Sequence, residues 1–215
     1  MSFILASLFS LAIVAAPQGA AKPPVKAPAK APTAAKAPAA APAHPHVALE
    51  TPKGTIVIEL FPEKAPKTVA NFLQYTKSGF YNGTIFHRVI DGFMIQGGGF
   101  DAKGEKKGTK APVENESAKA LPNEAGTIAM ARTGDPHSAT AQFFINLGNN
   151  TPLNSGQTRD GWGYTAFGRV VKGMDVVNAI AKVPVAPGAI SEAVPNQQVL
   201  ITKVSVVPAP AAAKK

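Results

Sequence analysis

The sequence contains no cysteine and only four histidines in 215 residues. Without thiols the chain can form no disulfide bond and can use no cysteine nucleophile, iron–sulfur cluster or thiolate zinc site. No two histidines lie at the i, i+4 spacing of a helical metal site, and no cluster of carboxylates accompanies them. The sequence therefore predicts neither a metal site nor a cofactor.

Two further signatures of catalysis are missing. No Gly-x-Ser-x-Gly motif is present to carry a hydrolase nucleophile. The glycine run at 97–99 is not followed by Lys-Ser/Thr or by an expected helix, both of which a phosphate-binding loop requires. A strand end or a β-bulge is the better interpretation of those glycines. Covalent and phosphate chemistry are therefore not indicated.

Acidic residues are scarce, and none precedes Glu50. The chain has 22 Lys and Arg against 13 Asp and Glu, a net charge of +9. Six of the lysines lie near the two ends of the chain, at positions 22, 26, 30, 36, 214 and 215. Removing these six leaves 16 basic residues against 13 acidic ones, a net charge of only +3 for the remainder. A nucleic-acid-binding groove needs basic residues clustered on the folded part, so no nucleic-acid partner is predicted.

The apolar run near the N-terminus is too short to span a bilayer comfortably. It covers 14 residues, Phe3–Ala16, whereas a membrane span takes about 20. This length is typical of a signal peptide, and the small residues at 19–21 offer a cleavage site before Lys22. We therefore predict a signal peptide at residues 1–21 and a periplasmic or secreted location in the bacterial envelope. Because no Lys or Arg precedes the run, an uncleaved N-terminal anchor is the alternative.

Large apolar side chains are almost absent from residues 22–45, which consist mainly of Ala, Pro and Lys. Frequent prolines break helices, and there is little to bury, so a disordered, extended linker is predicted. Its lysines would make weak contact with an anionic envelope surface; a solubilising tail is the alternative. Residues 209–215 have the same composition and are predicted to be a disordered basic tail.

Residues 46–208 have the pattern of one folded domain. Short alternating apolar runs are typical of strands, and two segments, 66–77 and 174–183, have helical spacing. The predicted strands are 47–51, 55–60, 85–89, 94–97, 127–131, 142–146, 166–171 and 199–207. Strands this short need closure to protect their edges, so the prediction is mainly β: a closed eight-stranded antiparallel barrel capped by two α-helices.

Polar and apolar side chains alternate along three of these strands. If Ile95, Phe143 and Ile145 fill the barrel, alternation puts a neighbouring set of side chains on the outside: Met94, Gln96, Gln142 and Phe144. In the strand around 86–90, Arg88 is expected to share a face with Phe86 and to oppose His87. Two amides beside apolar side chains favour a shallow groove for an extended peptide, with partly buried packing at the barrel rim as the alternative.

The sequence resembles the cyclophilins, which are peptidyl-prolyl cis-trans isomerases, over residues 46–208. The matching blocks keep the family's order and spacing: Phe86–Ile90, Gly92–Gly98, Gly126–Arg132, Ser138–Ile145 and Phe167–Val171. Asn115-Glu116 and Gly161-Trp162-Gly163-Tyr164 resemble the exported or periplasmic bacterial branch of the family. A linked series of this kind is far more specific than any single motif.

The resemblance implies a role for nine residues. The family's catalytic arginine corresponds to Arg88. Its substrate-binding positions correspond to Phe93, Met94, Phe144 and Leu153 in the proline pocket, to Gln96, Ala131 and Gln142 along the peptide backbone, and to Tyr164 where many members carry histidine. Pro152 stands where an aromatic residue is usual, which puts cyclosporin affinity in doubt more than isomerase activity.

The resemblance implies an isomerase that accelerates X-Pro isomerisation during protein folding, with Arg88 stabilising the twisted imide. Its substrates would be proline-containing polypeptides, including unfolded or partly folded exported proteins, and the chain is expected to be a monomer. One alternative is a non-catalytic proline-binding chaperone or scaffold on the same fold. Another is an envelope-tethering protein whose function resides in the cationic linker.

Overall fold

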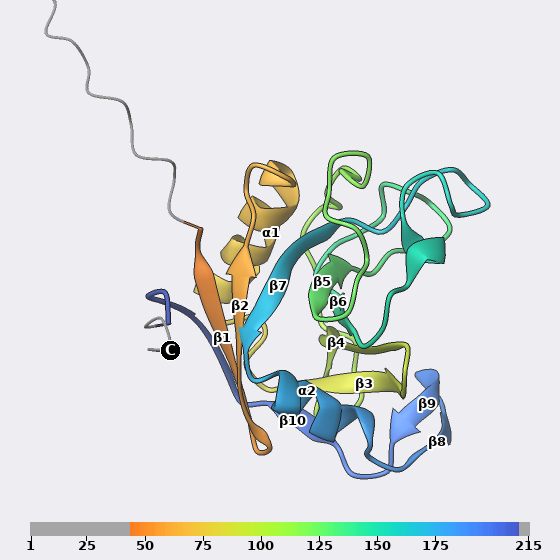
Figure 1. Cartoon of the computed structure of the whole chain (residues 1–215). Helices are drawn as coiled ribbons and strands as arrows, with labels where there is room; N and C mark the ends of the chain where they lie inside the picture. Colours follow the sequence, from red (N-terminus) through yellow and green to blue (C-terminus); the bar gives the residue numbers. More distant parts are fainter. Residues whose placement is uncertain (1–43, 211–215) are drawn as a thin grey trace, which may run out of the picture. The chain divides into compact units, whose positions relative to one another are not determined.

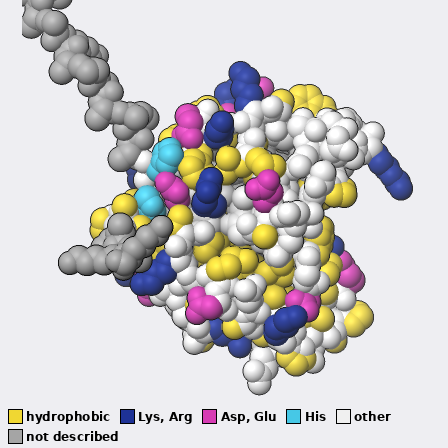
Figure 2. Space-filling view, viewed as in Figure 1, with side chains coloured by type: hydrophobic (Ala, Val, Ile, Leu, Met, Phe, Trp, Pro, Cys, Tyr) yellow, Lys and Arg dark blue, Asp and Glu magenta, His cyan; other side chains and the backbone are white. Residues whose placement is uncertain are grey.

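The structure is a computed structural model that describes residues 44–210. The predicted signal peptide, the linker up to residue 43 and residues 211–215 of the predicted tail lie outside the described residues. Within residues 44–210, none of the helices combines the length and apolar character needed to cross a membrane. On the face seen in Figure 2, Lys and Arg side chains are scattered among acidic ones and form no single basic patch.

Nine strands form one antiparallel sheet that curls into a nearly closed barrel (Figure 1). In sheet order they are β10 (Val199–Ile201), β3 (Thr84–Ile90), β4 (Met94–Asp101), β6 (Phe143–Asn146), β5 (Thr127–Met130), β7 (Ala166–Lys172), β2 (Gly54–Leu60), β1 (His46–Thr51) and β11 (Lys203–Val207). The two edge strands, β10 and β11, are separated only by Thr202, so the chain itself joins the ends of the sheet.

The predicted eight-stranded barrel is confirmed as a fold, and the difference in strand number has a local cause. The expected strand 199–207 is broken at Thr202, whose backbone N–H and hydroxyl both donate to the carbonyl oxygen of Glu50, at 2.8 and 3.0 Å. Because both groups bind one carbonyl, the chain bends there and passes from β3 to β1. The other seven barrel strands begin and end within one residue or so of the predicted bounds, except that β4 continues four residues past its predicted end, to Asp101.

Two helices cover the barrel, α1 (Pro66–Lys77) and α2 (Met174–Ala181). Helix α1 has the predicted bounds: Pro66 occupies its first turn, and it buries a stripe that includes Val69, Phe72 and Tyr75. Helix α2 ends two residues before the predicted end, because Pro184 lies close by and the residue before a proline disfavours the helical conformation. Figure 1 shows the two helices at different ends of the barrel.

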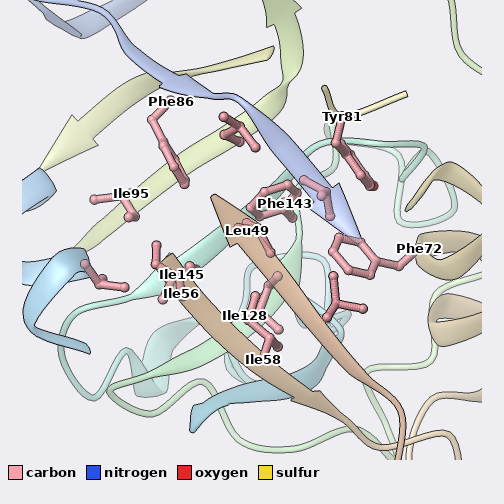
Figure 3. Packing of buried hydrophobic residues seen from close by; sticks show 14 of the residues in the cluster. Leu49, Ile56, Ile58, Phe72, Tyr81, Phe86, Ile95, Ile128, Phe143 and Ile145 are labelled. Atoms are coloured by element: carbon pink, nitrogen blue, oxygen red, sulfur yellow. The ribbon is translucent and has the colours of Figure 1, made fainter. Parts of the chain in front are cut away.

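The barrel interior is filled by aliphatic side chains and a cluster of aromatic rings (Figure 3). Ile95, Phe143 and Ile145 are fully buried there, as predicted. The ring of Phe143 makes edge-to-face contacts with three other rings, Phe72, Tyr81 and Phe86, at centroid distances of 5.5–6.2 Å. Such rings contribute a large part of core stability because each buries a large area.

A second, smaller apolar cluster lies on the outer face of β4, β5, β6 and the start of β7. Its buried members are Met94, Ala129, Phe144 and Ala166. In the register of β4 and β6, Gln96 lies opposite Phe144 and Ile95 lies opposite Ile145. Alternate residues of the same strands therefore line the barrel core and this outer cluster, as the sequence pattern predicted.

The expectation that Arg88 shares a face with Phe86 is wrong. Phe86 and Val89 both pack in the barrel core, whereas Arg88 lies outside with the second cluster. The register between β3 and β4 shifts between Phe86, opposite Gly97, and Arg88, opposite Gln96. This β-bulge adds one residue on β3 and interrupts the alternation, which a strict period of two cannot anticipate.

Two elements were not predicted from the sequence. One is a short 3-10 helix, η1 (Thr151–Leu153). The other is a separate two-stranded sheet of β8 (Val185–Gly188) and β9 (Ser191–Pro195), which packs against β3. Prolines at positions 184, 187 and 195 are more typical of loops, so this hairpin gave no strand signal in the sequence.

Candidate active site

A hollow of about 140 Å³ opens on the outer face of the barrel over β3, β4 and β6. Its walls are formed by Arg88, Phe93, Met94, Gln96, Ala131, Arg132, Phe144, Leu153 and Tyr164. Eight of the nine residues proposed from the resemblance therefore line one hollow. The ninth, Gln142, lines an adjoining hollow of about 210 Å³ that shares Gln96, Ala131 and Arg132 with the first.

The floor of the first hollow is apolar. Met94 and Phe144 are 2% and 4% exposed, and the ring of Tyr164 meets that of Phe144 edge-on at a centroid distance of 5.7 Å. The backbone N–H of Tyr164 donates to the carbonyl oxygen of Leu153 at 2.8 Å, which joins two walls of the hollow. The result is a small apolar site of the size of one compact side chain, with polar groups around it.

Two glutamine amides line the boundary between the hollows. Gln96 Nε2 donates to Gln142 Oε1 at 2.9 Å. Gly99 makes this position of Gln142 possible, since a Cβ atom on Gly99 would lie within 2.4–2.5 Å of the Gln142 side chain. Beside them, the backbone N–H of Ala131 donates to the carbonyl oxygen of Gln142 at 3.0 Å. That N–H is therefore occupied, which leaves the carbonyl of Ala131 for any contact with a peptide.

The guanidinium of Arg88 is half-buried at the rim of the apolar hollow. Its Nη1 lies 4.0 Å from the sulfur of Met94. Its Nε and Nη2 lie 2.8 and 2.6 Å from Oε1 of Glu192, on β9. The hydrogen bond from Arg88 lowers the pKa of the Glu192 carboxyl from 4.5 to about 2, so this carboxylate is charged at neutral pH. Glu192 was not among the predicted site residues.

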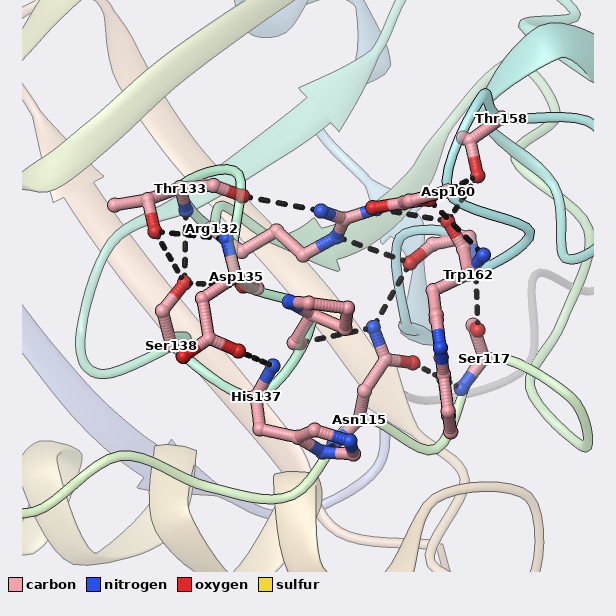
Figure 4. A network of polar contacts seen from close by, with 12 residues as sticks. Asn115, Ser117, Arg132, Thr133, Asp135, His137, Ser138, Thr158, Asp160 and Trp162 are labelled. Carbon is pink, nitrogen blue, oxygen red and sulfur yellow. Dashed lines mark hydrogen bonds and ion pairs between the residues drawn. The ribbon is translucent and has the colours of Figure 1, made fainter.

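Arg132 organises the loops around the second hollow (Figure 4). Its side chain is only 5% exposed, pairs with Asp160 at 2.8 Å, and donates to the carbonyl oxygens of Trp162, Gly163 and Thr133. Its guanidinium carbon also lies 4.7 Å from the centre of the Tyr164 ring. Because one cation binds both the 131–133 segment and the 160–164 loop, Arg132 holds Tyr164 against the hollow.

A chain of three asparagines, of which Asn123 and Asn146 are buried, supports the opposite walls. The side-chain amide of Asn123 donates to the carbonyl oxygens of Leu153 and Tyr164, at 3.2 and 3.1 Å. Asn146 Nδ2 donates to Asn123 Oδ1, and Asn150 Nδ2 donates both to Asn146 Oδ1 and to the carbonyl oxygen of Phe93. These amides fix the backbone of three pocket residues. Lone asparagines carried no signal in the sequence, because turns use the same residue.

Titratable groups do not gather around the hollow in the way that metal sites require. Within residues 44–210, no group of three or more His, Asp or Glu side chains is arranged to bind a metal ion. The histidine next to Arg88, His87, points away from the site and is 3% exposed. Burial lowers the pKa of His87 from 6.5 to about 4, so its ring is neutral at pH 7.

The comparison with known families gives the class of protein to which this barrel belongs. Residues 46–206 match the family described as cyclophilin type peptidyl-prolyl cis-trans isomerase. The chain belongs to this family, and it is a peptidyl-prolyl cis-trans isomerase whose substrates are proline-containing polypeptides.

Bacterial relatives cover the domain almost completely. The chain is 54% identical over 161 residues to peptidyl-prolyl cis-trans isomerase B of Escherichia coli (strain K12), which covers 74% of this chain and 98% of the relative. It is 55% identical over 156 residues to the isomerase cyp18 of Streptomyces antibioticus, covering 72% and 94%. A crystal structure of a Cryptosporidium parvum cyclophilin has a TM-score of 0.64 at 28% identity and covers 78% of this chain and 99% of that one.

Proposed function

We propose that Arg88 catalyses isomerisation by stabilising the twisted form of the X-Pro bond. Rotation breaks amide resonance, which accounts for a barrier of about 18–20 kcal/mol. At the twisted transition state the imide nitrogen becomes pyramidal and carries a lone pair that neither planar ground state offers. A fixed donor directed at this lone pair binds the transition state selectively, so no nucleophile is needed. The observation that carries the proposal is the guanidinium of Arg88 at the rim of an apolar hollow.

The apolar hollow is the proposed site of the proline ring. Phe93, Met94, Phe144 and Leu153 would clamp the pyrrolidine ring, with Tyr164 closing one side. The volume of about 140 Å³ suits a single proline ring. A crystal structure of the C. parvum relative in the presence of the dipeptide Ala-Pro, with a TM-score of 0.62, supports this class of ligand.

The residues before the proline are proposed to lie along the glutamine edge. Gln96 and Gln142 use one amide hydrogen and one oxygen on each other, which leaves Gln96 Oε1 and Gln142 Nε2 for a peptide backbone. The carbonyl oxygen of Ala131 supplies a further acceptor. Holding this part of the substrate still means that only the prolyl side rotates, which places the imide nitrogen near Arg88 throughout the reaction.

Substitution of Arg88 tests the mechanism. Arg88→Ala should lower kcat/KM by about 10²–10³-fold, the cost of removing one preorganised donor, and should leave peptide binding nearly unchanged. Arg88→Lys keeps the charge but loses the planar fork of donors, so its rate should lie much closer to that of the alanine variant than to wild type. NMR exchange on a short X-Pro peptide measures the rates, and peptide titration with circular dichroism verifies binding and folding.

One outcome of the same experiment would favour the non-catalytic chaperone or scaffold. If a folded Arg88→Ala variant kept more than half of the wild-type rate, the guanidinium would have no role in the reaction. The site would then be a proline-binding surface. A guanidinium that faces an apolar hollow favours catalysis, since binding of the ring alone would require only the apolar walls.

We also propose that the protein is exported and acts as a monomer on unfolded or partly folded exported proteins. The apolar run at 3–16 followed by small residues supports cleavage near Lys22. Mass spectrometry of the protein from its native envelope fraction should find a chain that begins near residue 22. Intact, membrane-bound chains that begin at Met1 would replace the signal peptide with an anchor. Gel filtration should give the mass of one chain.

The cationic linker is proposed to make weak contact with an anionic envelope surface, through Lys22, Lys26, Lys30 and Lys36. Deletion of residues 22–43 should release the protein from this surface and leave catalysis unchanged. Unaltered localisation after the deletion would make the segment a solubilising tail. Loss of localisation together with full retention of isomerase activity would support the tethering role as an addition to catalysis.

A further inference from the structure

The catalytic cation proposed above is bound by a carboxylate on an element outside the barrel. Glu192 Oε1 accepts a hydrogen bond from Nε at one edge of the Arg88 guanidinium and forms an ion pair with Nη2 at the same edge. The third nitrogen, Nη1, lies on the side of Met94 and the apolar hollow. A guanidinium has a planar, rigid fork of donors, so fixing the Nε–Nη2 edge also fixes the direction of Nη1.

The hairpin that carries Glu192 packs against the barrel through β9. Strand β9 packs against β3, which carries Arg88, and buries Ala193 and Pro195, whereas every residue of β8 is exposed. Ser191 in turn orients the carboxylate: its hydroxyl donates to Glu192 Oε2 at 3.2 Å and accepts from the backbone N–H of Ala193 at 3.1 Å. The carboxylate therefore has a defined position, although its side chain is 62% exposed.

We propose that Glu192 is a positioning residue for the isomerase reaction, and that the β8–β9 hairpin serves to hold it against Arg88. This inference rests on the proposed role of Arg88. The carboxylate restricts the guanidinium to the orientation in which Nη1 faces the proline ring. The entropy of the long arginine side chain is then lost on folding, before the substrate binds, so it does not add to the activation barrier.

The opposite role for this ion pair would be inhibitory. A carboxylate could hold the guanidinium away from the substrate, so that each turnover would have to break the pair. The geometry favours positioning, because Arg88 lines the apolar hollow while it is bound to Glu192. Glu192 also leaves Nη1 without a carboxylate partner among residues 44–210, so one donor remains for the imide nitrogen.

Substitutions at Glu192 separate these roles. Glu192→Ala should lower kcat about tenfold, less than the 10²–10³-fold expected for loss of the donor itself, and should leave KM and peptide affinity nearly unchanged, since the apolar walls are untouched. Glu192→Gln keeps an oxygen acceptor at the same place and should recover most of the lost rate. A side chain that serves only the stability of the hairpin would not give a loss confined to kcat with recovery by glutamine.

Two control variants test charge and local structure. Glu124→Ala removes the same charge from a carboxylate that forms no ion pair within residues 44–210. Val185→Ala alters an exposed side chain on the same hairpin. Both should retain wild-type kinetics. Thermal melts of all four variants should agree with wild type to within a few degrees.

A double-mutant cycle with Arg88→Ala decides the inference. In the Arg88→Ala background, adding Glu192→Ala should cause no further loss of rate, because the group that Glu192 positions is gone. An equal loss in both backgrounds, or a faster Glu192→Ala enzyme, would overturn the positioning role. A wild-type rate in the single Arg88→Ala variant would instead overturn the catalytic proposal itself, so the two failures are distinguishable.

Discussion

His87 and Arg88 are neighbours in the chain and have opposite environments. The guanidinium of Arg88 faces the hollow, while the His87 ring is buried against Phe100 at a centroid distance of 4.7 Å. Within the described chain, His87 Nδ1 has no hydrogen-bond partner. Because burial disfavours the charged form of the imidazole, the histidine beside the proposed catalytic residue is a structural group rather than an acid or base.

The low pKa of His87 predicts that stability falls in mild acid. The folded-state value of about 4 lies below the unfolded value near 6.5, so the unfolded chain binds more protons between these two pH values. The stabilisation is complete above pH 6.5 and is lost as the pH falls towards 4, by about 3 kcal/mol in all. Denaturant unfolding at a series of pH values measures the loss.

His87→Phe is the control for this prediction. The substitution keeps an aromatic ring beside Phe100 and removes the titrating group. As the pH falls from 7 to 4, the unfolding free energy of the wild type should therefore decrease more than that of the variant. If the unfolding free energies of the two proteins changed with pH in parallel, the acid sensitivity would come from groups other than His87.

Phe143 and Phe144 are adjacent residues with different functions. Phe143 packs against three aromatic rings in the barrel core, and Phe144 lines the proposed proline site. Phe143→Ala should lower the unfolding free energy by about 3–5 kcal/mol. Phe144→Ala should cost less stability, about 1.5–3 kcal/mol for the lost burial, and should lower kcat/KM by weakening capture of the proline ring. Thermal melts and rates of the two variants test this; greater instability of Phe144→Ala would contradict it.

At the scale of elements, the barrel strands were predictable because their alternation is regular. The strand pair β4–β6 has one side chain in the core for each one on the outer face, which is why Met94, Gln96 and Phe144 could be assigned to the site. Arg88 could be assigned only through the family resemblance. No sequence pattern indicates the bulge in β3, which places Arg88 on the opposite face of the strand from Phe86.

The unpredicted parts of the site share a physical cause. Glu192 lies on a proline-rich hairpin, and Asn123, Asn146 and Arg132 act through contacts with groups far away in the chain. The Arg88–Glu192 contact joins residues 104 positions apart. A pattern of local periodicity contains no information on such pairs. Most walls of the hollow could therefore be predicted from the sequence and the family resemblance, whereas Arg132 and the other groups that hold those walls could not.

Strand β4 offers a test of the glutamine edge through Gly99. Gly99→Ala would bring a Cβ atom to 2.4–2.5 Å from the side chain of Gln142. That side chain is flexible and can move aside, so stability should change little, but its hydrogen bond to Gln96 should be lost. We expect kcat/KM to fall roughly two- to tenfold, equivalent to a hydrogen bond of about 0.5–1.5 kcal/mol. Kinetics on an X-Pro peptide measure the effect.

Gly108→Ala is the matched control for Gly99→Ala. A Cβ atom on Gly108 meets no atom within 4 Å, so this variant should retain both the rate and the stability of wild type. Wild-type kinetics in a folded Gly99→Ala variant would mean that the position of Gln142 is unimportant for catalysis.

At the scale of the whole molecule, the folded part begins before the first barrel strand. The side chain of His44 contacts two carboxylates, Glu59 at 2.8 Å and Glu63 at 3.4 Å, and its ring packs edge-on against Phe61. The carbonyl oxygen of Pro45 accepts a hydrogen bond from Leu60 at 2.9 Å. These contacts lie at β2 and the segment after it, away from the hollow on the outer face of β3, β4 and β6.

Two truncated proteins therefore should differ in stability and agree in catalysis. A chain that begins at His44 keeps every contact of residues 44–45 and should match the full chain in melting temperature and in kcat/KM. A chain that begins at His46 loses the partly exposed His44 pairs and the hydrogen bond to Pro45, which together contribute about 1–2 kcal/mol, so it should melt at a lower temperature. Its kcat/KM, measured well below that temperature, should be unchanged, because the hollow and Arg88 are formed by other strands. A fall in kcat/KM for the chain that begins at His44 would show that residues before His44 contribute to catalysis.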